Sequence, residues 1–184
     1  RSSDLAFSQT YSPLEILVSD DASSDGTPAI IESVSGAYAG SHRLRINLNS
    51  HNLGVGAHVN KLFEMASGEL LVLAAADDIS HPDRVERLAH AWCTQNPQPW
   101  ALHSSARVID ESGHLLGRYV GKLRGRENDI GMLIRHYRGA LLLGATTAYD
   151  RRLHEEFGPL RADLPVEDVP LTVRAAMLGR VAYL

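Results

Sequence analysis

The chain has 184 residues, of which 44% are hydrophobic and 22% are charged, a composition typical of a globular protein with one domain of ordinary size. Its 18 basic and 22 acidic residues give a net charge of −4, which argues against a general surface for nucleic acid or anionic membranes. The single cysteine, Cys93, excludes an internal disulfide framework and a cysteine-rich zinc site. No apolar run reaches the length of about 18 residues that a membrane span needs.

In the first half of the sequence, apolar runs that predict strands alternate with segments that predict helices. The run EILVS predicts a strand over residues 15–19, and a helix is expected to begin at Pro28 and to continue through residue 34. Alternating apolar residues predict a strand over 44–48. A strand buried on both faces is expected over 70–76, because its residues are small or branched and apolar throughout. Between these two strands, one helical stripe is formed by Val55, Val59, Leu62, Phe63 and Ala66.

The second half continues the same alternation. Helices are predicted from Pro82 to about residue 94 and over 152–157, and a hairpin is predicted from strands 100–110 and 114–119 around the turn ESG. A strand of small residues is expected over 144–150, and a last strand begins at Arg180. Further helical faces are predicted for Ile130, Leu133, Ile134 and Tyr137, and for Val169, Val173 and Ala176. This pattern predicts one α/β domain.

Adjacent carboxylates follow two of the predicted strands. Asp20 and Asp21 end the first strand, and Asp77 and Asp78 end the strand over 70–76. Open α/β sheets bind ligands at the carboxyl ends of their strands, so these residues are placed to hold a divalent cation or a ribose hydroxyl. The alternative is that Asp77 and Asp78 only cap the next helix, for which one residue would be enough.

The residues after the first strand also fit the spacing of an EF-hand loop, but the context does not. A strand precedes the loop instead of a helix, and Pro28 occupies a position that should be able to form β-structure. The glycines of NLGVG lack the spacing of a dinucleotide-binding loop. The arrangement that fits is a site for a nucleotide-diphosphate sugar, in which carboxylates hold Mg²⁺ or Mn²⁺ against the diphosphate.

Transfer of a sugar to a hydroxyl also needs a base to take the proton of that hydroxyl. Glu167 and Asp168 are two adjacent candidates at a predicted helix start. Acidic residues are common in the first turn of a helix, because they complement the helix dipole, and from position alone this structural role is favoured.

The sequence resembles the family 2 glycosyltransferases over nearly its whole length. The stretch SQTYSPLEILVSDDASSDGT, residues 8–27, is similar to the opening signature of that family. NLGVGAHVN, ASGELLVLAAADD, the pair Gly144 and Ala145, and the pair Glu167 and Asp168 follow in the family's order. The resemblance implies a GT-A fold, that is, a Rossmann-like mixed sheet flanked by helices. It also implies inverting, metal-dependent transfer from a nucleotide sugar.

The resemblance implies a role for each candidate site residue. Asp168 would be the catalytic base, Asp78 the direct metal ligand, and Asp77 a second metal ligand or a ribose contact. The acceptor side would be lined by Gly144, Ala145 and Glu167, and the nucleotide sugar would be bound by Asp20, Asp21, Asn52, Gly54 and Asp77.

The sequence departs from the family pattern in a few places. Ala75 stands where many members have Asp, and Val59 replaces a common Arg. The family's first strand and its final metal ligand are missing, so residues 1–184 are expected to be a single GT-A domain truncated at both ends. The expected partners are a nucleotide-sugar donor and a saccharide or lipid-linked acceptor, without nucleic acid. A cytoplasmic location is expected, with peripheral membrane association through the missing segments as a further expectation.

Two other functions remain open at this stage. A sugar-phosphate nucleotidyltransferase would share the fold, but it needs a Gly- and Arg-rich phosphate loop near the amino terminus, which the sequence lacks. An inactive sugar-nucleotide binding module is the other alternative. Ala75 favours that reading, and the intact Asp78 and Asp168 oppose it.

Overall fold

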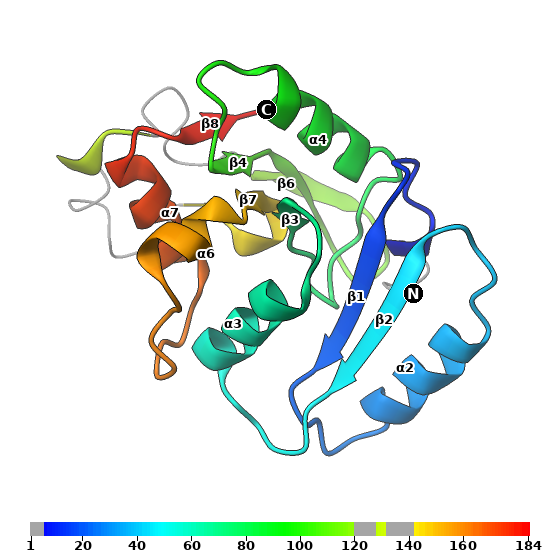
Figure 1. The fold of residues 1–184 in the computed structure, drawn as a ribbon. Coiled ribbons are helices and arrows are strands. Elements are labelled where there is room, and N and C mark those ends of the chain that lie inside the picture. The colour runs from blue at the N-terminus through cyan, green and yellow to red at the C-terminus, as the bar shows by residue number, and fades with distance from the viewer. Residues whose placement is uncertain (1–5, 120–127, 132–141) are drawn as a thin grey trace.

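The computed structural model describes residues 6–119, 128–131 and 142–184. Within these ranges it forms three separate β-sheets with helices around them (Figure 1). The predicted helical face that includes Leu133, Ile134 and Tyr137 lies outside the described residues. In the part of the chain that the structure describes, no helix is long and apolar enough to cross a membrane.

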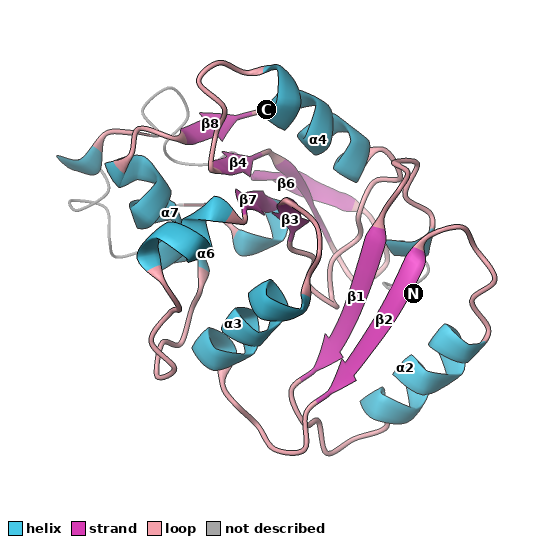
Figure 2. Ribbon diagram, viewed as in Figure 1, coloured by secondary structure: helices cyan, strands magenta, loops and turns pink. Residues whose placement is uncertain are grey.

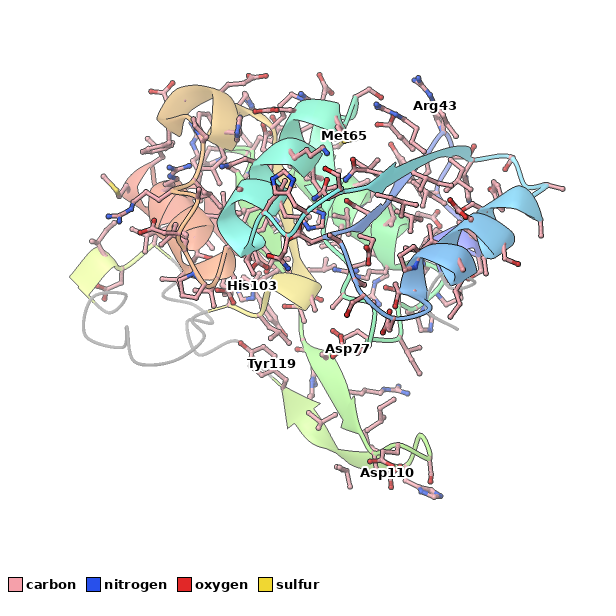
Figure 3. All side chains as sticks on the ribbon, turned by 90° about the horizontal axis from the view of Figure 1, so that it is seen from below. Arg43, Met65, Asp77, His103, Asp110 and Tyr119 are labelled. Carbon is pink, nitrogen blue, oxygen red and sulfur yellow. The ribbon has the colours of Figure 1, made fainter. Side chains whose placement is uncertain are left out.

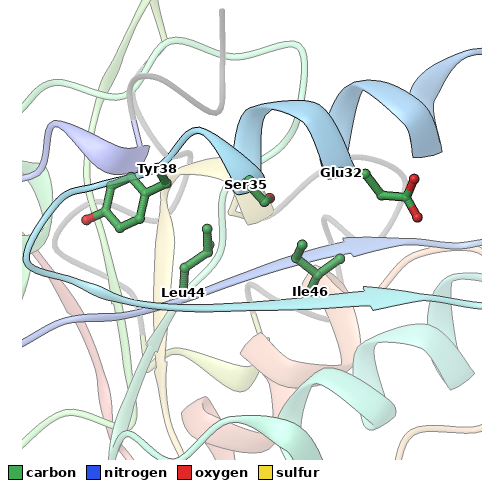
Figure 4. Close-up of a pocket in the computed structure, with 6 residues that line it drawn as sticks. Glu32, Ser35, Tyr38, Leu44 and Ile46 are labelled. Carbon is green, nitrogen blue, oxygen red and sulfur yellow. The ribbon is translucent and has the colours of Figure 1, made fainter.

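The first sheet is a parallel pair. Strand β1 (Glu15–Asp20) pairs with β2 (Arg43–Leu48), and Asp20 lies opposite Leu48 at the carboxyl ends of both strands. Helix α2 (Thr27–Gly36) connects them, and none of its side chains is fully buried. An open hollow of about 450 Å³ lies between α2 and β2 (Figure 4). It is lined by Glu32, Ser35, Gly36, Tyr38, Leu44 and Ile46. None of the predicted site residues lines this hollow.

The second sheet is mixed, as predicted, and has the strand order β3-β7-β4-β8 (Figure 2). Helix α3 (Val55–Met65) leads into β3 (Leu70–Val72), which is antiparallel to β7 (Thr147–Asp150). β4 (Ala101–His103) is antiparallel to β7 and parallel to β8 (Val181–Tyr183). The element order thus confirms the α/β class.

The two faces of this sheet carry two clusters of apolar side chains, because alternate residues of a strand point to opposite sides. On one face, Leu102 and Ala148 pack with Leu88 and Ala91 of helix α4 (Arg84–Thr94). On the other face, the sheet packs against α3 and against helices α6 (Arg152–Phe157) and α7 (Asp168–Met177). The buried residues of that larger cluster include Val59, Phe63, Leu71, Ala101, Tyr149, Leu153, Leu171, Ala175 and Val181.

Two predicted strands are shorter than the sequence indicated. β3 ends at Val72 instead of residue 76, because residues 74–79 leave the sheet as an exposed segment that turns where the Asp78 N–H bonds to the Ala75 carbonyl. The predicted strand over 144–150 begins with a 3₁₀ turn, η1 (Gly144–Thr146), and only then becomes β7.

The predicted strand over 100–110 is divided between two sheets. β4 ends at His103, and after two residues the chain continues as β5 (Ala106–Ile109). β5 pairs with β6 (Leu115–Tyr119) in a separate antiparallel hairpin, with a bulge at Val108 and Ile109. The hairpin projects from the body of the molecule, with Asp110 at its turn and Tyr119 close to the body (Figure 3).

The buried face of α7 also differs in part from the predicted one. Leu171, Thr172, Ala175 and Ala176 are buried, whereas Val173 is half-buried. Only Ala176 belongs to both sets, and Val169 packs at the edge of the core. The helix begins at Asp168, so Glu167 stands immediately before it.

Candidate functional site

The first carboxylate pair ends β1 and is occupied by hydrogen bonds within the chain. Asp20 accepts the N–H and the hydroxyl of Ser23 at 2.8 and 2.6 Å, which closes the turn after the strand. Asp21 reaches across to the loop that precedes α3, where it accepts the N–H groups of Leu53 and Gly54 at 2.9 and 3.0 Å. It also accepts the side-chain N–H of Asn49 at 2.8 Å. Asp21 therefore joins the ends of β1 and β2 to the start of α3.

The pKa of Asp21 reflects this position. Partial burial acts to raise the pKa, but the hydrogen bonds from Leu53, Asn49 and Gly54 and the charge of His58 outweigh it, so the pKa lies below its ordinary value. The carboxylate form is thus the one that the loop stabilises.

The predicted loop residues Asn52 and Gly54 form the turn into α3. The Asn52 side chain accepts the Gly54 N–H at 2.9 Å. Gly54 has φ of +79°, a conformation that L side chains rarely adopt, which explains a glycine here. Its N–H thus bonds to both Asn52 and Asp21, and the structure brings these three predicted donor-side residues together.

A polar network beside Asp21 was not predicted from the sequence. His58 Nε2 lies 2.6 Å from Ser19 Oγ, and its Nδ1 lies 3.6 Å from the Asp21 carboxylate. On the other side of Asp21, Lys61 donates to the Asn49 side chain at 2.6 Å. Residues three or four apart on a helix share a face. The spacing of His58 and Lys61 could therefore have indicated that both side chains lie on the same side of α3.

The second carboxylate pair lies on the segment after β3. Both Asp77 and Asp78 are exposed. Arg84, in the first turn of α4, donates to the Leu73 carbonyl at 2.8 Å and to the Ala145 carbonyl at 2.7 Å. Arg84 thus ties the segment that carries both aspartates to η1. Burial lowers the pKa of Arg84 to about 10, and the nearby charge of Asp78 opposes that shift. Sequence reasoning missed Arg84.

The third group surrounds the start of α7. A Cβ atom added at Gly144 would lie 2.6 Å from Glu167 Oε1 and 3.6 Å from Asp168 Cβ, so the 3₁₀ turn lies close to both residues, and a side chain there would displace the Glu167 carboxylate. Burial raises the pKa of Asp168, and hydrogen bonds with the backbone of Val169 and Gly144 offset part of that effect. A carboxyl with a raised pKa beside a close backbone turn is typical of a general base.

Two tyrosines lie near this carboxyl. Burial, followed by the charge of Asp168, raises the pKa of Tyr119 at the end of β6 and of Tyr149 on β7. Both hydroxyls are buried. The surroundings of Asp168 are thus more apolar than those of Asp77 and Asp78.

Helix α3 packs against the loop that leads to α7. A Cβ atom added at Gly56 would lie 2.3 Å from the Arg161 carbonyl oxygen, so α3 and this loop can approach only with glycine at that position. One turn later, the side chain of Asn60 bonds to the backbone of Leu160. Both residues belong to the motif NLGVGAHVN, but their contact with this loop was not predicted.

Residues 2–156 match the family described as glycosyl transferase family 2. The chain belongs to this family. The family 2 domain is 31% identical over 180 residues to an uncharacterized protein of Mycobacterium tuberculosis, which covers 97% of this chain and 50% of the relative. It is 29% identical over 156 residues to the undecaprenyl-phosphate 4-deoxy-4-formamido-L-arabinose transferase of Sodalis glossinidius. That match covers 79% of this chain and 45% of the transferase. The chain thus spans about half the length of the curated relatives that it matches.

The fold of this glycosyltransferase is also found in solved structures. The mannosyltransferase PcManGT of Pyrobaculum calidifontis, solved in complex with GDP-Man and Mn²⁺, superposes with a TM-score of 0.74 at 22% identity. The match covers 99% of this chain and 49% of the mannosyltransferase. The similarity confirms the GT-A fold that the sequence predicted.

A divalent cation fits the second carboxylate pair of this glycosyltransferase. In the described ranges, no three His, Cys, Asp or Glu side chains form a metal-binding cluster. Asp77 and Asp78 are nevertheless exposed on one segment, and Mg²⁺ typically takes one or two protein carboxylates and fills its other positions with water and substrate phosphates. Two open carboxylates therefore suit a cation that arrives with a nucleoside diphosphate.

Proposed function

We propose that this family 2 domain transfers a sugar from a nucleotide-diphosphate sugar to a hydroxyl of a saccharide or lipid-linked acceptor, with inversion. The observation that carries the proposal is the link between the two acidic groups. Arg84 bonds to the carbonyls of Leu73, just before the exposed aspartates, and of Ala145. Ala145 follows Gly144, which lies close to Asp168. An open acidic pair and a half-buried carboxyl are thus held at the two ends of one short connection.

The donor side of the proposal concerns the ends of β1 and β2. Asp20, Asp21, Asn52 and Gly54 would hold the nucleotide, and support comes from their gathering at the carboxyl edge of a parallel pair. The GDP-Man and Mn²⁺ bound to the similar mannosyltransferase support a nucleotide sugar and a divalent cation as ligands.

Asp78 and Asp77 would hold Mn²⁺ or Mg²⁺, which when bound neutralises charge on the diphosphate leaving group. The chain's own groups supply the remaining chemistry. Asp168 accepts the proton of the acceptor hydroxyl as that oxygen attacks the anomeric carbon and the bond from that carbon to the diphosphate breaks. One displacement with one base inverts the anomeric carbon.

The acceptor side would be formed by Gly144, Ala145 and Glu167. Glu167 lies against Gly144. Burial raises the pKa of Asp168, which supports Asp168 as the base. The lipid-linked class of acceptor is supported by the name of the Sodalis relative, which specifies undecaprenyl phosphate. Such an acceptor implies that the domain acts at the cytoplasmic side of a membrane.

The deciding experiment is a panel of nucleotide sugars screened for thermal stabilisation in the presence of Mn²⁺, followed by product analysis with the donor selected. A donor at about 100 times its dissociation constant should stabilise the protein by about 2.7 kcal/mol. Release of nucleoside diphosphate supports glycosyl transfer, whereas release of pyrophosphate identifies a nucleotidyltransferase. Donor binding without turnover over a broad panel of acceptors identifies an inactive binding module.

A further inference from the structure

The hairpin of β5 and β6 exposes four large apolar side chains. Leu115 and Leu116 are 66% and 68% exposed, and Val108 and Ile109 are 44% and 39% exposed. Ile109 lies opposite Leu115 in the register, and both share the face that carries Arg107 and Arg118, because alternate residues of a strand point to the same side. Leu116 is the extra residue at the bulge, and Val108 points to the other face. A two-stranded hairpin gains little stability in water from such residues, and contiguous exposed apolar side chains indicate an interaction surface.

Two arginines lie directly across from each other in the hairpin. Arg107 on β5 pairs in register with Arg118 on β6, and both side chains are exposed. Residues opposite each other in an antiparallel pair share a face, and like charges there destabilise the pair. In the described part of the chain, neither arginine has a carboxylate partner, and Arg118 donates only to the Ser105 hydroxyl, at 2.9 Å. An anion placed between these guanidinium groups would relieve their repulsion.

The turn of the hairpin is acidic and limits how the surface can be used. Asp110 accepts the N–H groups of Ser112 and His114 at 2.9 Å and faces the His114 ring at 3.2 Å. The hydrogen bond from the His114 backbone is the largest cause that lowers the pKa of Asp110, so its carboxylate stays charged. Glu111 is exposed beside it. Two negative charges at the turn oppose insertion of the tip into an anionic surface, so the hairpin must approach such a surface with its side.

We propose that the side of the β5–β6 hairpin docks on the surface of an anionic phospholipid bilayer. Arg107 and Arg118 bind lipid phosphates, and the exposed apolar side chains enter the boundary between head groups and acyl chains. The occupant is argued from charge complementarity, because two exposed guanidinium groups side by side match the phosphates of an anionic lipid surface. Asp77 lies on the side of the body from which the hairpin projects (Figure 3).

The test measures binding of the purified protein to sedimented vesicles of phosphatidylcholine, with and without phosphatidylglycerol. The unaltered protein should bind the mixed vesicles more tightly. The double variant Arg107→Gln, Arg118→Gln should weaken that binding by about fivefold for each arginine. The variant Leu115→Ser, Leu116→Ser should weaken binding to the mixed vesicles by about tenfold or more.

Matched controls come from exposed residues elsewhere in the structure. Arg43→Gln, Arg87→Gln removes two exposed charges, and Ile30→Ser, Met177→Ser changes two apolar residues that are each 62% exposed. In Figure 3, Arg43 lies on the opposite side of the body from the hairpin. Both control variants should bind vesicles like the unaltered protein. All four variants should unfold at the same temperature, and Leu116→Ser alone replaces the double leucine variant if the latter fails to fold.

Four results would overturn the proposal. Equal binding to both kinds of vesicle, or equal losses in hairpin and control variants, removes the hairpin as an anionic lipid surface. Displacement from vesicles by inorganic phosphate assigns the arginines to a soluble phosphate ligand. Self-association that disappears in the hairpin variants, without vesicle binding, assigns the surface to a second copy of the chain. The measurement uses no sugar transfer, so its failure leaves the proposed function untouched.

Discussion

The side chain of Asn60 exchanges two hydrogen bonds with the backbone of Leu160. Its Nδ2 donates to the Leu160 carbonyl at 2.8 Å, and the Leu160 N–H donates to its Oδ1 at 2.7 Å. Asn60 lies on α3, whose start is held by the donor-side loop, and Leu160 lies in the loop that leads to Asp168. The two proposed halves of the site are therefore joined by one amide side chain.

Asn60→Ala should break this connection. It leaves the Leu160 N–H and carbonyl without these partners, so we expect the free energy of unfolding to fall by about 2 kcal/mol. Donor affinity should change little, and turnover should fall because the loop before α7 is released. Glu64→Ala, an exposed change on the same helix, is the control and should alter stability by about 0.5 kcal/mol or less. Urea denaturation and steady-state kinetics measure both effects, and equal stability of the two variants would contradict the role of Asn60.

Arg84 gives a second test, because it joins β3 to η1 by two hydrogen bonds to carbonyl oxygens. Arg84→Ala leaves both carbonyls without this donor and should lower the free energy of unfolding by about 1–3 kcal/mol. Arg87 is exposed on the next turn of α4, and Arg87→Ala should change it by about 0.5 kcal/mol or less. Chemical denaturation of the two variants compares them directly. If Arg87→Ala lowers the free energy of unfolding as much as Arg84→Ala does, the two hydrogen bonds of Arg84 do not contribute specifically to stability.

The sequence predicted the elements better than it predicted their contacts. Strand β2 and helices α3 and α4 were expected, because each carries a clear apolar period. Strand β1 was expected from its continuous apolar run, and α6 from the Gly and Pro that follow it. The strand over 100–110 was not divided correctly. Ser104 and Ser105 are only a weak turn signal, and the pairing partners decide where the chain changes sheets. β3 was predicted too long, because the apolar run continues to residue 76 although the chain leaves the sheet after Val72.

Within the site, the motifs indicated which residues gather but not what holds them. Asp21 was expected to face a ligand, and its hydrogen bonds show that it also fixes the turn into α3. Arg84 and Asn60 were missed, because each bonds to backbone groups far away in the sequence. Every residue has such backbone groups, so the sequence does not indicate which of them a side chain will contact. The roles assigned to Asp77, Asp78 and Asp168 stay predictions.

Asp21→Asn should lower stability in a pH-dependent way. The folded state lowers the pKa of Asp21, so the carboxyl binds its proton less tightly when folded than when unfolded. The stabilisation is therefore present above the ordinary pKa of 3.8 and is lost as the pH falls through the lower folded pKa. The variant should be less stable than the unaltered protein at neutral pH, with weaker donor binding. The two melting temperatures should converge in acid; a difference that stays constant with pH would contradict this account.

Removal of the divalent cation should weaken nucleoside diphosphate binding sharply. Without a cation, Asp77 and Asp78 face the diphosphate as like charges. Calorimetric titrations with Mn²⁺ and with EDTA compare the two states, and Asp77→Asn, Asp78→Asn supplies a protein in which the difference should shrink. Equal affinities of the unaltered protein with and without EDTA would exclude these aspartates as a metal site.

Asp168→Asn should separate chemistry from binding. Asn is nearly the same size as Asp and keeps a hydrogen-bonding oxygen, but it cannot take a proton from the acceptor. We expect turnover to fall by about 10²–10⁴-fold, while donor and metal affinities persist. Glu167→Gln is the matched variant, since adjacent residues at a helix start point about 100° apart and only one can face the hydroxyl. Its loss should be smaller and should appear in acceptor affinity.

The raised pKa of Asp168 adds a pH test to the same pair of variants. Because burial raises this pKa above the ordinary value of 3.8, the folded protein binds the proton more tightly than the unfolded chain does. The stability of the unaltered protein therefore falls as the pH rises from 3.8 through the folded pKa, and Asp168→Asn should be the more stable protein at neutral pH. The advantage should vanish in acid, where the unaltered carboxyl is protonated in both states. Kinetic pH profiles should show an acidic limb above pH 3.8 that Glu167→Gln retains. Near-normal turnover in Asp168→Asn would remove Asp168 as the base, and a far greater loss in Glu167→Gln would assign the base to Glu167.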